Sequence, residues 1–144
     1  MANTKFGIQA VSENNTKTVV KARNFTMVID EPPSLGGNDT GANPVEYLLA
    51  ALAGCLNVMG NLIAKEMSIV LKSYKINISG SLDPDYLFGK TEEGRAGYKE
   101  IIAQLEVQTD ANKEILEKWA KEVERRCPIS DNISHPTSLK VIVK

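Results

Sequence analysis

Hydrophobic and polar positions alternate in three short stretches within the first 30 residues of the chain. Turn-forming residues, among them Asn14 and Asn15, separate these stretches. Alternation with a period of two is typical of strands that bury one face. The pattern therefore predicts three strands connected as a meander, at residues 6–12, 18–22 and 25–30.

The longest apolar run follows a turn-rich loop at residues 34–41. Asn43 suits the N-cap of a helix and Pro44 its first position, and residues 45–67 contain helix-forming residues without an internal proline. Between residues 47 and 63 apolar side chains occur on nearly every face of this helix, whereas a surface helix has one apolar stripe. We therefore expect a central helix that is covered on all sides.

A membrane span is the competing interpretation of this helix. Polar or charged side chains interrupt the apolar run at Glu46, Asn57, Asn61, Lys65 and Glu66. The uninterrupted run is shorter than the roughly 20 apolar residues that a bilayer requires. Three short strands leave much of the helix uncovered, so the pattern favours cover by a second, intertwined chain over a membrane.

The second half of the chain returns to a strand pattern and contains one more helix. Alternation predicts strands at residues 69–82 and 98–108, joined by a glycine-rich and charged loop at 86–97. A helix capped by Asp110 is expected to end before Pro128, and a final strand is expected at 139–143. The irregular order of strands and helices predicts a single α+β domain over residues 1–144, with largely antiparallel pairing.

The charge balance argues against polyanionic partners. Lys plus Arg number 17 and Asp plus Glu number 18, without a long block of one sign, so neither nucleic acid nor an anionic membrane is expected to bind. The polar N-terminal residues lack the pattern of a signal peptide, and a cytoplasmic location is the resulting expectation. His135 is the only histidine and the cysteines are far apart in sequence, so we expect no metal site. The loop at 36–41 lacks the spacing of a nucleotide-binding motif, and we interpret it as a loop that shapes the entrance of a site.

The chain contains two cysteines, Cys55 within the apolar helix and Cys127 directly before Pro128. In a reducing compartment two such thiols are either catalytic or inert, and a permanent structural disulfide is less expected. They form a candidate redox pair. The alternative is that both are buried small hydrophobic residues without a chemical role.

Two motifs around these cysteines resemble one protein family. Residues 36–55 read GGNDTGANPVEYLLAALAGC, residues 127–130 read CPIS, and Cys127 lies 72 positions after Cys55. In this order the motifs resemble the OsmC/Ohr family of osmotically induced and organic-hydroperoxide-resistance proteins. The resemblance implies an intertwined homodimer with long central helices enclosed by antiparallel sheets. It also implies that Cys55 attacks an organic hydroperoxide, that Cys127 resolves the product into a disulfide, and that a dithiol, such as a lipoyl group, reduces the disulfide. On this resemblance no bound cofactor is required.

A cysteine with a pKa near ~8.5 needs a neighbouring cation or hydrogen-bond donor to react as a thiolate at neutral pH. Arg23, between the second and third predicted strands, resembles the arginine that family members supply from their N-terminal sheet. A guanidinium remains charged when desolvated and offers donors in a fixed geometry. The alternative for Arg23 is a solvated arginine in a surface turn.

The glutamate that orients this arginine in family peroxidases is shifted in this sequence. The tenth residue before Cys55, where the resemblance places that glutamate, is Val45, and Glu46 is the ninth. One position rotates a side chain by about 100° around a helix. Glu46 is therefore a candidate catalytic residue. The alternative role, for which the sequence gives equal support, is to stabilise the positive N-terminus of the helix.

The sequence leads to three functional hypotheses. The first is a thiol-dependent peroxidase for organic hydroperoxides, with Cys55, Cys127, Arg23 and Glu46 as the site residues. The second is a redox or ligand-binding protein of the same fold with little peroxidase activity, and the third is a structural interaction protein. Turnover of an organic hydroperoxide with a dithiol separates the first hypothesis from the others.

Overall fold

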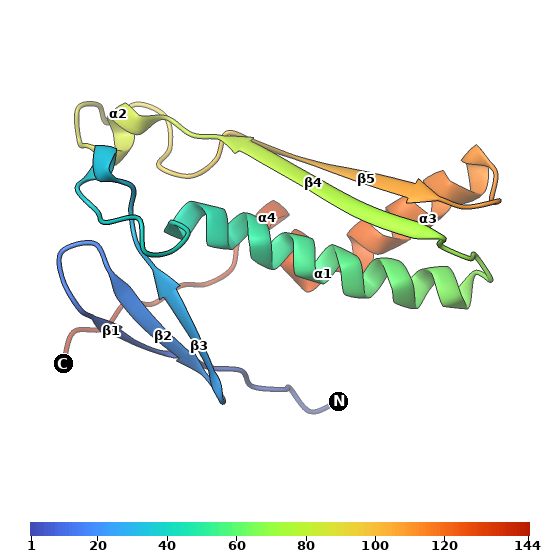
Figure 1. Ribbon diagram of the computed structural model, residues 1–144, viewed down its shortest axis with the longest axis horizontal. Coiled ribbons are helices and arrows are strands. Elements are labelled where there is room, and N and C mark those ends of the chain that lie inside the picture. Colours follow the sequence, from blue (N-terminus) through green and yellow to red (C-terminus); the bar gives the residue numbers. More distant parts are fainter. The chain divides into compact units, whose positions relative to one another are not determined.

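The computed structural model describes all residues from Met1 to Lys144 (Figure 1). Helices and antiparallel sheets make up the chain, which confirms the predicted α+β class. The contacts group into two compact units, Met1–Ala50 and Ala51–Lys144, and each unit is described by itself. The single domain expected from the sequence stays a prediction.

The first unit contains the predicted meander. β1 (Gln9–Ser12), β2 (Thr18–Ala22) and β3 (Phe25–Ile29) pair antiparallel in chain order. The turn between β2 and β3 is tight, and Arg23 adopts a positive φ of 54° within it. All three strands are confirmed, although β1 begins three residues later than the alternation indicated.

A buried carboxylate organises the loop after β3. Asp30 accepts hydrogen bonds from the hydroxyls of Thr16 (2.8 Å) and Thr40 (2.7 Å) and from the backbone N–H groups of Glu31, Asn38 and Thr40. The Thr40 hydroxyl is the main cause that holds the pKa of Asp30 well below its usual range. Through these bonds the loop, which includes the short 3-10 helix η1 (Pro33–Leu35), is fixed to the end of the sheet.

The long helix α1 (Pro44–Glu66) begins where the sequence indicated. The Asn43 side chain accepts the N–H of Glu46 at 2.9 Å, and the Glu46 carboxylate accepts the N–H of Asn43 at 2.9 Å. This reciprocal pair is a capping box, which satisfies backbone donors that a helix N-terminus would otherwise leave unpaired. It explains why α1 starts at Pro44.

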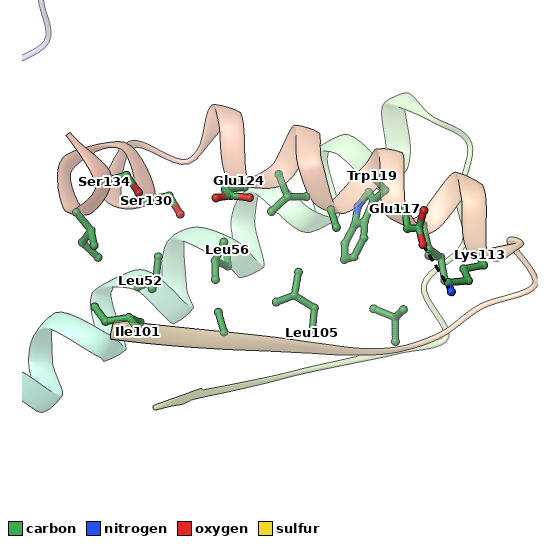
Figure 2. A pocket seen from close by; sticks show the side chains of 16 residues that line it. Leu52, Leu56, Ile101, Leu105, Lys113, Glu117, Trp119, Glu124, Ser130 and Ser134 are labelled. Carbon is green, nitrogen blue, oxygen red and sulfur yellow. Dashed lines mark ion pairs between the residues drawn. The ribbon is translucent and has the colours of Figure 1, made fainter. Parts of the chain in front are cut away.

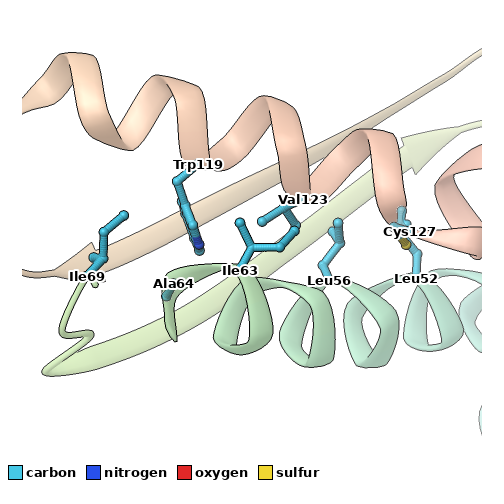
Figure 3. Packing of buried hydrophobic residues seen from close by; sticks show 8 residues of the cluster. All are labelled: Leu52, Leu56, Ile63, Ala64, Ile69, Trp119, Val123 and Cys127. Atoms are coloured by element: carbon cyan, nitrogen blue, oxygen red, sulfur yellow. The ribbon is translucent and has the colours of Figure 1, made fainter. Parts of the chain in front are cut away.

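The second unit contains the α1 residues after Ala50, a two-stranded ribbon and three further helices. The ribbon pairs β4 (Ser73–Ser81) antiparallel with β5 (Glu100–Gln108). The other helices are α2 (Pro84–Leu87), α3 (Lys113–Arg126) and α4 (Pro128–Ser134). Leu56 and Ile63 of α1 face Trp119 and Val123 of α3 in the core (Figure 3).

The predicted starts of β4 and α3 in this unit were wrong. The strand expected from residue 69 begins at Ser73, because Ser68 adopts a positive φ of 57° and Ile69 turns back to bond the Ala64 carbonyl and enter the core. The N-cap of α3 is Asn112, whose side chain accepts the N–H of Ile115, whereas Asp110 forms an ion pair with Lys72. Pro128 follows the end of α3 as expected, but it also starts α4.

The final strand predicted at residues 139–143 is absent. Leu139, Val141, Ile142 and Val143 are between 79 and 94% exposed, and none of them pairs with a strand of this chain. Alternating β-branched residues favour an extended backbone, but a strand also needs a hydrogen-bonding neighbour. The sequence pattern alone could not reveal that this neighbour is missing within one chain.

Within the chain α1 buries only one face. Its buried residues are Leu52, Leu56, Gly60, Ile63 and Ala64. Val58 is 62% exposed and Leu62 44%. By length and composition alone α1 could cross a membrane, and 28% of its most apolar 18-residue window is buried. The core helix of a soluble protein meets the same criteria of length and composition. That a second chain covers the remaining face of α1 stays a prediction.

Candidate active site

The structure brings the two predicted cysteines together. Cys55 lies on α1 and is partly exposed, and Cys127 is buried at the junction of α3 and α4. Both thiols are free, and their side chains are within hydrogen-bonding contact. Contact between two reduced thiols from separate helices is the arrangement that reversible disulfide formation requires.

The turn that starts α4 directs backbone donors at both sulfurs. The N–H of Ser130 donates to the Sγ of Cys127 at 3.4 Å, and the N–H of Ile129 donates to the Cys55 thiol. Pro128 occupies the first position of α4 and has no N–H, so Ile129 and Ser130 carry the first free amides of this helix. Such donors stabilise a thiolate more than a thiol.

Opposing effects act on the pKa of Cys55, the candidate nucleophile. Burial raises the pKa of the Cys55 thiol, and hydrogen bonding to Cys127 adds to the rise, whereas the Ile129 amide lowers it. The net effect is a raised pKa. Within the second unit, Cys55 is therefore mostly protonated at neutral pH, and faster reaction would require a further positive group.

Arg23 is the sequence-predicted source of that charge, and it belongs to the first unit. Its guanidinium carbon lies 5.0 Å from the centre of the Phe25 ring, a cation–π contact. Its role toward Cys55 stays a prediction.

Glu46 also belongs to the first unit, and its described contact is the capping box with Asn43. This contact accords with the helix-terminus role that the sequence offered as the alternative. An orienting role toward Arg23 stays a prediction as well.

An apolar cavity of about 550 Å³ lies beside the start of α4 (Figure 2). Its walls come from α1, β5, α3 and α4 and include Leu52, Leu56, Ile101, Leu105 and Trp119. Ser130, whose amide contacts Cys127, lines the cavity, and an ion pair between Lys113 and Glu117 (3.8 Å) lies toward its far end. Cavities of this size and composition suit apolar small molecules. No cluster of three or more metal-ligating side chains occurs in the chain.

Sequence reasoning found the two cysteines but missed three groups around them. The amides of Ile129 and Ser130 and the hydroxyl of Tyr74 contact the thiols or the adjacent backbone. Pro128 was a partial signal for the amides, because proline is favoured at the first position of a helix. Tyr74 carried no signal, since its contact with α1 spans 18 residues of sequence.

Comparison with known proteins supplies the family. The sequence model of the OsmC-like protein family matches residues 36–142 of this chain. A hydroperoxide reductase of Mycoplasma pneumoniae is 24% identical over 139 residues, which cover 96% of this chain and 94% of that protein.

Solved structures show the same fold. The crystal structure of an OsmC-like protein from Mycoplasma pneumoniae has a TM-score of 0.80 at 22% identity, covering 92% of this chain and 89% of its own. An organic hydroperoxide resistance protein from Legionella pneumophila has a TM-score of 0.66 at 20% identity, with coverage of 92 and 91%.

Proposed function

The chain belongs to the OsmC-like protein family, and from this premise we propose that it is a thiol-dependent peroxidase that reduces organic hydroperoxides through Cys55 and Cys127. The contact between the two reduced thiols is the observation that carries the proposal. The name of the Mycoplasma pneumoniae relative, hydroperoxide reductase, supports the same activity.

The proposed reaction has two steps on the protein. The Cys55 thiolate attacks one oxygen of the hydroperoxide, the O–O bond breaks, and the alkoxide leaves as an alcohol after it takes a proton. Cys55 is then a sulfenic acid. The Cys127 thiolate attacks the Cys55 sulfur, the S–O bond breaks as the disulfide forms, and the hydroxide that leaves takes a proton from solvent to become water. An external dithiol supplies the two electrons that restore both thiols.

Two kinds of observation support an organic substrate and a dithiol reductant. The apolar cavity suits the hydrocarbon part of a hydroperoxide, which hydrogen peroxide lacks. The resemblance to the OsmC/Ohr family suggests a reductant such as a lipoyl group. A cytoplasmic location, where dithiols are kept reduced, is part of the same proposal.

Steady turnover tests the proposed function. We expect the protein to consume cumene hydroperoxide continuously in the presence of a reduced lipoyl compound, and Cys55→Ser to reduce the rate to that of the buffer. Hydrogen peroxide at equal concentration should react more slowly, because it has no hydrocarbon part that the apolar cavity could bind. A wild-type rate equal to that of the buffer would contradict the proposal.

Two observations favour a second candidate function. The raised pKa of Cys55 and the capping role of Glu46 are compatible with a redox or ligand-binding protein of this fold that has little peroxidase activity. In that case the two thiols would still form a disulfide with a disulfide reagent. Turnover with cumene hydroperoxide would remain at the background rate.

We also propose that the chain assembles as a homodimer. The exposed apolar residues of α1, Val58 and Leu62, and the exposed segment at residues 139–143 support this, because apolar surface of this extent is usually covered by a partner. Light scattering at micromolar concentration should give twice the chain mass of 15.7 kDa. A monomer that binds no dye specific for exposed hydrophobic surface would contradict the assembly.

A further inference from the structure

We propose that Tyr74 is a positioning residue which, together with Trp119, holds α1 at Gly60 and so sets the separation of the Cys55 and Cys127 sulfurs. The inference rests on the proposed function in one respect, namely that the two thiols act as a redox pair. It gives Tyr74 and Trp119 a positioning role and no part in the bond changes of the reaction.

The first contact joins β4 to the helix directly after the nucleophile. The hydroxyl of Tyr74 donates to the backbone carbonyl of Leu56 at 3.1 Å. Leu56 follows Cys55 in the sequence, so this bond fixes the backbone next to the nucleophile candidate. The carbonyl has a second lone pair for its bond within the helix.

The second contact joins α3 to the same helix one turn further on. The buried indole of Trp119 donates its Nε1–H to the carbonyl of Gly60 at 2.9 Å. The rings of Tyr74 and Trp119 meet edge to face, with centres 5.5 Å apart and planes inclined by 68°. Trp119 and Cys127 are both placed by α3, since Cys127 caps its C-terminal end. The spacing between α1 and α3 that Trp119 sets therefore also determines the position of Cys127 relative to Cys55.

Gly60 makes this close approach possible. A Cβ atom at this position would lie 2.6 Å from Cε1 and 2.7 Å from Oη of Tyr74, closer than real Cβ contacts. Alanine would otherwise favour the helix over glycine. Gly54, on the same helix, has nothing within 4 Å of a Cβ atom placed there. The two glycines form a matched pair, in which only Gly60 lies against the tyrosine.

Tyr74 remains a hydrogen-bond donor over the pH range in which thiols ionise. Burial raises its pKa to about 12, and the charge of Cys127 adds to the rise. The bond to the Leu56 carbonyl is therefore present in both protonation states of the cysteine pair.

Such positioning affects disulfide formation strongly, because a disulfide tolerates only a narrow range of distances and angles between its two cysteines. Small displacements of reacting groups can change intramolecular rates by large factors. The measurable quantity is the effective concentration of one thiol toward the other. It is obtained from the equilibrium of the protein disulfide with reduced and oxidised glutathione, and it does not depend on peroxidase activity.

The experiment compares two matched pairs of variants at a temperature where all are folded. Gly60→Ala should lower the effective concentration by about tenfold or more, whereas Gly54→Ala should leave it at the wild-type value. Tyr74→Phe, which removes only the hydroxyl, should lower it by about fivefold. Tyr47→Phe is its control, because the Tyr47 hydroxyl donates to the Val28 carbonyl at 2.7 Å, within the first unit.

An effective concentration of wild-type size in Tyr74→Phe would overturn the proposal. Equal decreases in Tyr74→Phe and Tyr47→Phe would also overturn it, because they would indicate a general loss of stability. Should Gly60→Ala fail to fold, the tyrosine pair decides alone. A wild-type protein that forms the disulfide with glutathione but does not react with hydroperoxide would contradict the proposed function and leave the positioning role intact.

Discussion

Replacing Cys127 with serine should stop the reaction with an organic hydroperoxide at a sulfenic acid on Cys55. In the wild-type protein the buried Cys127 thiol contacts Cys55, so a sulfenic acid formed there meets a thiol at once and becomes a disulfide. One equivalent of cumene hydroperoxide should then remove two titratable thiols. In Cys127→Ser a single thiol should disappear, and a dimedone adduct should increase the mass of the protein.

Cys55→Ser is the control for this experiment. It retains the buried Cys127 and should lose no thiol under the same conditions, because Cys127 has no exposed surface to offer a peroxide. A wild-type protein that keeps both thiols after one equivalent of hydroperoxide would contradict the peroxidase proposal. A second equivalent should carry Cys127→Ser to sulfinic acid, since no resolving thiol protects the intermediate.

Local sequence signals were sufficient for most of the fold. The capping box at Asn43 and Glu46 and the alternation in β2 depend on residues that are close together in the sequence, and both were predictable. The strand predicted at residues 139–143 was wrong because pairing is not a local property. The burial of Ile69 shows the same limit, since the core cluster that it joins includes Trp119 and Val123 of α3.

The candidate site was predictable only in part. Two cysteines in motifs of the OsmC/Ohr type indicated a pair, and the structure places their side chains in contact. The residues that hold α1 could not be predicted, because Tyr74 and Trp119 reach it across 18 and 59 residues of sequence. Gly60 carried a weak signal as a glycine inside a helix, which often marks close packing. The group packed against Gly60 is the Tyr74 ring.

The pH dependence of the peroxide reaction should reveal whether a cation acts on Cys55. Burial and the neighbouring Cys127 raise the pKa of the Cys55 thiol, so the thiolate fraction at neutral pH is small. Below the pKa this fraction increases tenfold for each pH unit, and the second-order rate constant should increase in parallel. A positive group near the sulfur would favour the thiolate and move this increase to lower pH.

Arg23→Ala should therefore move the pH profile to higher pH by about one unit and lower the rate at pH 7 by about tenfold, which corresponds to about 1.4 kcal/mol of barrier. Arg23→Lys retains the charge without the planar donors, and its rate should fall between those of the alanine variant and the wild type.

Glu46→Gln keeps an oxygen that can accept the Asn43 N–H, so a role limited to the capping box predicts nearly the wild-type rate. A tenfold decrease in Glu46→Gln would instead indicate that Glu46 orients the arginine. Stopped-flow oxidation of these variants between pH 5 and 9, a range chosen around thiol ionisation, measures both effects. An Arg23→Ala profile that coincides with the wild type would remove Arg23 from the site, and the amides of Ile129 and Ser130 would then be the groups left to stabilise the thiolates.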